Sequence, residues 1–147
     1  MISSNKRILA ALDGSVTQRK VAEKAVRCAS DNKAHLCFAH VIDAVYSEAS
    51  PEEMQRLAGK VEQDIREKLA DVIEEAQADE NIQSFQIMVA TGALMDCLHH
   101  EIVDVFEPDL VICCRRGFSG LHYAFAGSVS TYLIRNMNCD VLVIPND

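Results

Sequence analysis

The segment from Cys114 to Ser130 holds the residues whose types and spacing are best suited to chemistry. It reads Cys-Arg-Arg-Gly-Phe-Ser-Gly-Leu-His-Tyr-Ala-Phe-Ala-Gly-Ser-Val-Ser, and it follows an apolar run. A helix that begins near Ser128 would offer free backbone N–H groups and the positive end of its dipole, which attract phosphate. Glycine lets the backbone approach a ligand closely, and Arg115 and Arg116 add positive charge. The segment therefore predicts a phosphate site.

The elements that must position this segment are short apolar runs alternating with helical patterns. Strands are predicted at Arg7–Leu12, His35–Ile42, Ser84–Ala90, Asp109–Cys114 and Asp140–Pro145. Helices are predicted from Val16, from Pro51 to about Asp79, from Ala93 to Phe106 and from Ser128 to Asn136. This alternation predicts one α/β domain over residues 1–147, a three-layer α/β/α sandwich around a five-stranded parallel sheet.

Two of these helices have apolar residues at helical spacing and are expected to face the core. The long second helix should bury one continuous stripe, and the third should bury one shorter face. The stripe of the long helix is Met54, Leu57, Val61, Ile65, Leu69, Val72 and Ile73. The face of the third is Leu94, Leu98, Ile102, Val105 and Phe106.

The bulk composition limits the partners. A net charge of −8 argues against a nucleic-acid or anionic-membrane surface, because both need clustered Lys and Arg. No apolar run reaches the length of about 20 residues that crosses a bilayer. The six cysteines lie largely in apolar runs, and the first residues lack the apolar stretch of a signal peptide. We therefore expect reduced thiols and a cytoplasmic protein.

Other chemical readings of the sequence are weaker. Cys113 and Cys114 are adjacent, but neighbours on a strand point to opposite faces, so a vicinal redox pair is not expected. Cys114, at a strand end and near positive charge, is the one thiol with features that could lower its pKa. His99 and His100 follow Cys97, but adjacent residues of an α-helix point about 100° apart, so no structural metal is expected. The sequence has no P-loop, dinucleotide-binding or nucleophile-elbow motif.

Several pieces of the chain together resemble the universal stress protein family, over nearly its whole length. Its nucleotide-binding members carry Gly-x₂-Gly-x₉-Gly-Ser/Thr after the fourth strand. Here Gly117, nine intervening residues and Gly127-Ser128 match, with Gly120 in the spacer. The runs Leu12–Ser15 and Cys139–Pro145 also look like family signatures.

The resemblance implies a strand order of 3-2-1-4-5, the adenine nucleotide alpha-hydrolase-like arrangement. It also implies an ATP or AMP ligand. Asp13 would lie beside the nucleoside and could hold magnesium with the nucleotide, and Val41 would lie beside the adenine. The glycine loop and the helix start would hold ribose and phosphates, with at most one of the two arginines reaching a phosphate. The implied binding set is Ala11, Asp13, Val41, Cys114, Arg116, Gly117, Gly120, Gly127, Ser128, Val129 and Ser130.

One position departs from the family pattern, because Cys114 stands where the first glycine is usual. If this position needs a positive φ, a side chain costs on the order of 1 kcal/mol. If it needs only space, the thiol crowds the ligand. Family members without nucleotide usually lack motif glycines. Two functions therefore stay open: a nucleotide-responsive stress module, or a stress-linked interaction protein with a vestigial loop.

The resemblance also implies a homodimer, paired through the strand Asp140–Pro145. That strand is apolar, with Val141 and Val143 among its residues, and an exposed apolar edge needs a cover. No catalytic base is apparent in the sequence. The most that we expect in the way of catalysis is slow ATP hydrolysis or self-phosphorylation at Ser128 or Ser130.

Overall fold

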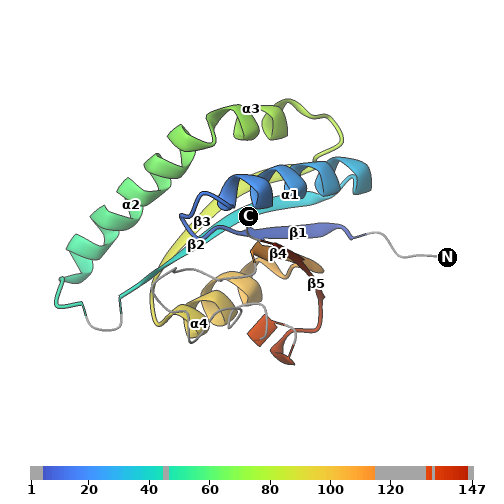
Figure 1. The fold of residues 1–147 in the computed structure, drawn as a ribbon. Helices are drawn as coiled ribbons and strands as arrows, with labels where there is room; N and C mark the ends of the chain where they lie inside the picture. Colours follow the sequence, from blue (N-terminus) through green and yellow to red (C-terminus); the bar gives the residue numbers. More distant parts are fainter. Residues whose placement is uncertain (1–4, 45–46, 115–131, 134, 146–147) are drawn as a thin grey trace.

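The computed structural model describes residues 5–44, 47–114, 132–133 and 135–145. Its five parallel strands form one sheet in the order β3-β2-β1-β4-β5, which confirms the implied order. They are β1 (Arg7–Ala11), β2 (His35–Asp43), β3 (Ser84–Gly92), β4 (Leu110–Cys114) and β5 (Asp140–Ile144). Helices lie on both faces of the sheet (Figure 1). The predicted fold class is therefore correct.

The strands are buried on both sides, which explains their unbroken apolar sequences. In β1, Ile8 and Ala10 belong to the core layer under α1 (Gln18–Asn32), whereas Leu9 and Ala11 belong to the opposite layer. Helix α1 begins two residues later than predicted. Val16 is 97% exposed and takes no part in the core.

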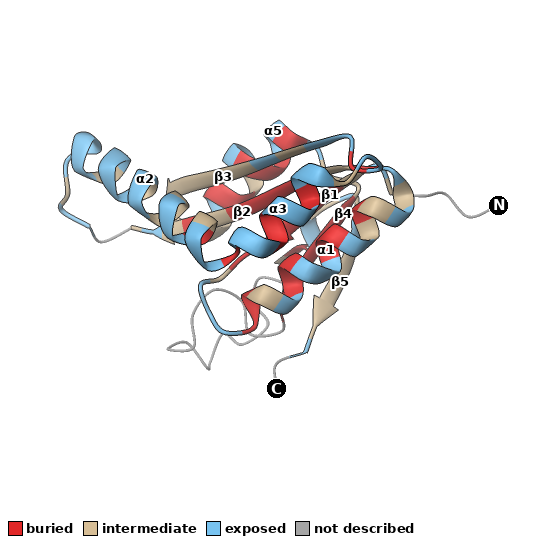
Figure 2. Ribbon diagram, turned by 90° about the horizontal axis from the view of Figure 1, so that it is seen from above, coloured by how far each residue is buried: buried red, intermediate tan, exposed pale blue. Residues whose placement is uncertain are grey.

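The long second helix is divided at Leu69 into α2 (Pro51–Lys68) and α3 (Ala70–Ala78). Leu69 has φ −112° and ψ 23°, outside the helical region, and the two helices run in different directions in Figure 1. Because of this bend, only the second half of the predicted stripe is buried. Ile65, Leu69 and Val72 are at most 5% exposed, whereas Leu57 is 40% exposed. The pale surface of α2 is plain in Figure 2.

The third predicted helix is helical throughout, but its middle is not an α-helix. It consists of α4 (Leu94–Asp96), the π-helix η1 (Cys97–Val103) and α5 (Asp104–Phe106). A π-helix holds more residues per turn than an α-helix, so it shifts the following side chains around the axis. Leu98, Ile102 and Phe106 are buried as predicted. The prediction for Val105 was wrong, since Val105 is 65% exposed.

Candidate functional site

The described part of the site lies at the switch point of the sheet, between β1 and β4. The strands β2 and β3 are added on one side of β1, and β4 and β5 on its other side, so the connections after β1 and β4 lead to opposite sides. Open α/β sheets bind ligands at such a switch point, outside the carboxyl ends of the strands. The register pairs Ala10 with Ile112, and continuing it sets Leu12 level with Cys114. Asp13 and Cys114 are therefore brought to the same point.

The two side chains make direct contact. The Cys114 thiol donates to Oδ2 of Asp13 over 2.8 Å. Cys114 is 2% exposed. The residue that replaces the first motif glycine thus lies against the acid that the resemblance assigns to the nucleoside.

The turn after β1 holds Asp13 in place. Oδ1 of Asp13 accepts from the backbone N–H of Ser15 at 2.9 Å and from the Ser15 hydroxyl at 2.7 Å, which is an Asx-type turn. Gly14 has φ 79°, a left-handed conformation that favours glycine. Its N–H donates to Oε1 of Gln18 at 3.0 Å. The sequence Asp-Gly-Ser therefore has a structural role in closing this turn. That role explains Asp13 without any bound ligand.

Sequence reasoning missed a histidine at this end of the sheet. Nδ1 of His40 lies 2.8 Å from the carbonyl oxygen of Leu12. A Cβ placed on Gly14 would lie 4.0 Å from Cε1 of the same ring. His40 occurs in an apolar strand, two residues beyond Phe38, and only that polar interruption could have drawn attention to it.

Ala11 and Val41, two further residues of the implied binding set, pack into the core. Each is 3% exposed, and both belong to the layer opposite Cys114. Val41 pairs with Ala90 of β3. The remaining members of the implied set lie outside the described residues: Arg116, Gly117, Gly120, Gly127, Ser128, Val129 and Ser130.

Asp13 is chemically suited to magnesium, which prefers carboxylate oxygens. Oδ1 already accepts two hydrogen bonds from Ser15, which fills its lone pairs. Oδ2 accepts from Cys114 and, counting partners among the described residues alone, retains one acceptor position. The residue therefore fits a magnesium–nucleotide ligand through Oδ2, provided that the thiol moves or shares this oxygen.

The Cys113 thiol, which lies beside the site, is poorly reactive. Cys113 and Cys114 face opposite layers, as strand geometry predicts. Burial raises the pKa of Cys113 to about 12, and the charge of Asp13 acts in the same direction. Burial also raises the pKa of Cys37 to about 12. All six cysteines lie in the described part of the chain, and none of them forms a disulfide.

A separate open groove of about 490 Å³ lies at the edge formed by β3. Met54 of α2, Met88 of β3 and Glu101 of η1 are among its lining residues. The groove includes neither Asp13 nor Cys114. It reaches Ala90, the strand partner of Val41, and so lies one strand further out than the adenine position that the resemblance implies.

The fold is an open parallel α/β sheet with an acidic side chain, Asp13, at its switch point. The model of the universal stress protein family matches residues 4–145, and the chain belongs to that family. A universal stress protein from Synechocystis is 26% identical, with 94% of this chain and 96% of the relative covered. A putative universal stress protein from Staphylococcus saprophyticus is 27% identical, with 95% and 83% covered.

Solved structures of the family share the fold. The universal stress protein UspA from Lactobacillus plantarum superposes with a TM-score of 0.74 at 19% identity, covering 97% of this chain and 99% of that one. A universal stress protein in complex with cAMP superposes with a TM-score of 0.66 at 21% identity, covering 97% of this chain and 98% of that one. The universal stress protein from Archaeoglobus fulgidus in complex with dAMP superposes with a TM-score of 0.58 at 15% identity, covering 97% of this chain and 99% of that one. Some members of this fold therefore bind adenine nucleotides.

Among the described residues, no helix has both the length and the apolar character needed to cross a membrane.

Proposed function

We propose that this protein is an adenine-nucleotide-responsive module of a stress response, acting as a homodimer in the cytoplasm. The observation that carries the proposal is the placement of Asp13 at the switch point, against the first position of the glycine-rich segment. That is where open α/β sheets bind ligands. Structural neighbours in complex with cAMP and dAMP support the choice of an adenine nucleotide.

Cys114 sets the affinity in this proposal. The nucleotide must replace or share the hydrogen bond from the thiol to Asp13, and it must pass the side chain that stands in place of glycine. A net hydrogen bond contributes roughly 0.5–1.5 kcal/mol, which corresponds to about two- to tenfold in affinity. We therefore propose that nucleotide binding is about two- to tenfold weaker than it would be with glycine at this position.

The test compares the natural protein with Cys114→Gly. Thermal unfolding is measured with increasing ATP and magnesium, AMP or cAMP, since a ligand of the folded state raises the midpoint. The variant should bind about tenfold more tightly, because Asp13 is released and space is gained. Cys113→Ala is the matched control, being the neighbouring thiol on the opposite face. Its nucleotide affinity should equal that of the natural protein.

The second candidate is a stress-linked interaction protein without nucleotide. It is favoured by the same contact, since a carboxylate already held by Cys114 and Ser15 has a structural explanation. Absence of any shift at millimolar nucleotide in both the natural protein and Cys114→Gly would establish this candidate and refute the first. Nucleotide released on denaturing the purified protein would do the reverse.

The proposed dimer forms through β5, with Asp140–Ile144 paired to a second copy. β5 is the edge of the sheet, and Val141 to Ile144 are each only partly buried. Four consecutive apolar residues on an edge strand invite pairing unless they are covered. None of the six cysteines, all of them in the described part of the chain, forms a disulfide. This supports the cytoplasmic placement, since such compartments keep cysteines reduced.

A further inference from the structure

The π-helix η1 brings His99 to the side of the helix on which His100 and Asp104 lie, whereas an α-helix would separate His99 from Asp104. Residues five apart lie about 140° from each other around an α-helix, whereas the wider π turn brings them back to one side. Nε2 of His99 lies 3.8 Å from Oδ1 of Asp104, the residue five positions on. Nδ1 of His100 lies 3.1 Å from Oδ2 of the same carboxylate. The two rings do not diverge as the sequence analysis expected, since they are stacked with centroids 4.3 Å apart.

The separations suit one metal ion. Ligand atoms bound about 2.0–2.2 Å from a tetrahedral zinc ion lie roughly 3.3–3.6 Å from one another. The two measured separations, 3.8 and 3.1 Å, lie on either side of this range. The candidate ligand atoms of all three residues lie within 4.8 Å of one another. A contraction of a few tenths of an ångström along the longer separation would bring Asp104 and His99 into range.

The His99 ring is held in the orientation that a metal-coordinating side chain requires. Its Nδ1 lies 2.9 Å from the hydroxyl of Tyr132, which leaves Nε2 directed toward Asp104. Histidine ligands of metals almost always bond a second group through the other ring nitrogen, which fixes the tautomer and the ring. The His99 side chain is 26% exposed. One ligand is therefore preorganised by a residue more than thirty positions away in the sequence.

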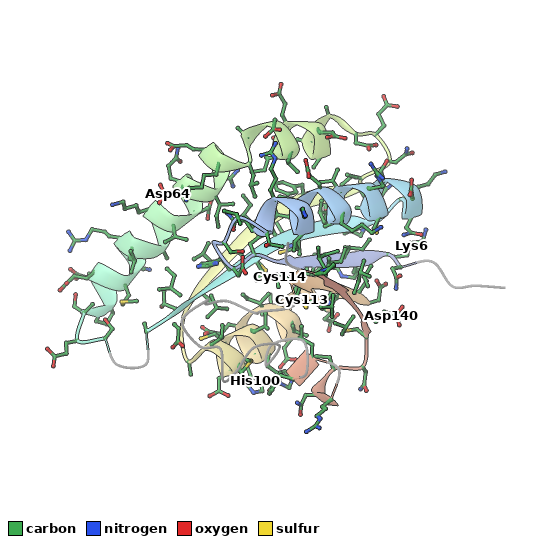
Figure 3. All side chains as sticks on the ribbon, viewed as in Figure 1. Lys6, Asp64, His100, Cys113, Cys114 and Asp140 are labelled. Carbon is green, nitrogen blue, oxygen red and sulfur yellow. The ribbon has the colours of Figure 1, made fainter. Side chains whose placement is uncertain are left out.

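The second histidine, His100, has an exposed ring that is able to turn toward a bound ion. The rings of His99 and His100 are stacked, with centroids 4.3 Å apart and planes 10° apart, so their lone pairs point in nearly parallel directions. One ring must turn for both nitrogens to reach one ion. The His100 side chain is 64% exposed and can do so. Figure 3 shows His100 on the helical layer opposite α1.

We propose that His99, His100 and Asp104 form a binding site for a divalent transition-metal ion such as Zn²⁺ or Ni²⁺. Imidazole ligands favour these ions over Mg²⁺ and Ca²⁺, which prefer oxygen. The net charge of −8 favours cations near the protein. Three protein ligands leave a coordination position for water or for a donor from another molecule. The site is separate from the nucleotide proposal and stands without it.

The test is a calorimetric titration of the full chain with Ni²⁺ and with Zn²⁺. The natural protein should bind one ion, and His100→Gln and Asp104→Asn should each bind at least about tenfold more weakly. Tyr132→Phe should lower the affinity by about tenfold, as loss of an outer partner does. His35→Gln is the control. His35 pairs with Ser84 on another face of the fold, and its loss should leave binding unchanged.

A second measurement identifies the ligands directly. The imidazole ¹⁵N resonances of His99 and His100 should shift on addition of Zn²⁺, while that of His35 stays in place. His100 and Asp104 are more than half exposed, so their variants keep the fold, which circular dichroism verifies. The proposal is overturned if His100→Gln and Asp104→Asn bind as tightly as the natural protein, or if the ¹⁵N resonances do not respond.

Discussion

At the scale of single residues, positions that the family pattern assigns to a ligand also serve the fold. Asp13 accepts three hydrogen bonds from Ser15 and Cys114 in the turn after β1. Gly14 takes a left-handed conformation, and Cys114 fills a buried place at the end of β4. Substitutions at these residues can therefore change both ligand binding and the stability of the fold, and the two effects must be measured separately.

Gly92 gives a prediction at this scale. It ends β3 with φ 146°, and a Cβ there would lie 2.7 Å from Sγ of Cys97, a contact closer than real Cβ atoms make. Gly92→Ala should lower the free energy of unfolding by about 1–3 kcal/mol, the usual cost of overpacking. Denaturant unfolding measures the change. Gly59→Ala is the control: Gly59 lies within α2 with nothing near its Cβ, and the substitution should stabilise by roughly 0.5–1 kcal/mol.

The thiols give a second residue-scale prediction. Burial raises the pKa of Cys37, Cys97 and Cys113 to about 12 each, with Glu101 adding to the effect at Cys97. At pH 8 only about one in ten thousand of these groups is a thiolate, the reactive form. Iodoacetamide should therefore label them only after unfolding. Mass spectrometry of the native protein should find label first at the half-buried Cys28 and Cys139. Rapid labelling of Cys113 in the native state would contradict the structure.

At the scale of elements, the bend at Leu69 decides how the second helix contributes. The helix after the bend, α3, contributes Val72, Ile73 and Ala76 to the core layer between α1 and the sheet. Within α2 itself, Ile65 is the buried residue, close to the bend. The N-terminal turn of α2 is capped, since Oγ of Ser50 accepts from the N–H of Glu53 at 3.2 Å.

This division predicts unequal stability along α2. Ile65→Ala should cost about 2–5 kcal/mol in the free energy of unfolding, because a buried side chain is removed from a packed core. Leu57→Ala, at a side chain 40% exposed, should cost less than half as much. Chemical denaturation of the two variants makes the comparison. Native-state hydrogen exchange should be faster before Ile65 than after it, and uniform protection along α2 would argue against the division.

At the scale of the whole molecule, the two sheet edges have different surroundings. β3 forms one edge, beside the groove that α2 and η1 help to line. β5 forms the other, with four partly buried apolar residues in sequence. The proposed dimer would cover the second edge and leave the first, with its groove, accessible.

The dimer prediction follows from that edge. Light scattering at micromolar concentration should give twice the mass of one chain, and Val143→Asp should reduce it to one, because a charge on an edge strand opposes pairing. Val105→Asp is the control, since Val105 is 65% exposed and lies on the helix α5, not on the edge strand. Its mass should equal that of the natural protein. A natural protein that scatters as a single chain would end the proposal.

The sequence by itself determined the strands, the order of elements and the family. Apolar runs such as Leu110–Cys114 and the Asp-Gly-Ser turn are local signals, and a parallel α/β sheet admits few topologies for them. The opposite orientations of Cys113 and Cys114 follow from the period of a strand.

Only the tertiary structure decided the bend at Leu69, the exposure of Val105 and the meeting of Asp13 with Cys114 across 101 residues. It also decided the π-helix that gathers His99, His100 and Asp104. In each case apolar spacing allows a regular helix or leaves the contact open, and packing against the sheet selects the conformation. Local periodicity carries no record of such long-range contacts, so these features could not be read from the residues alone.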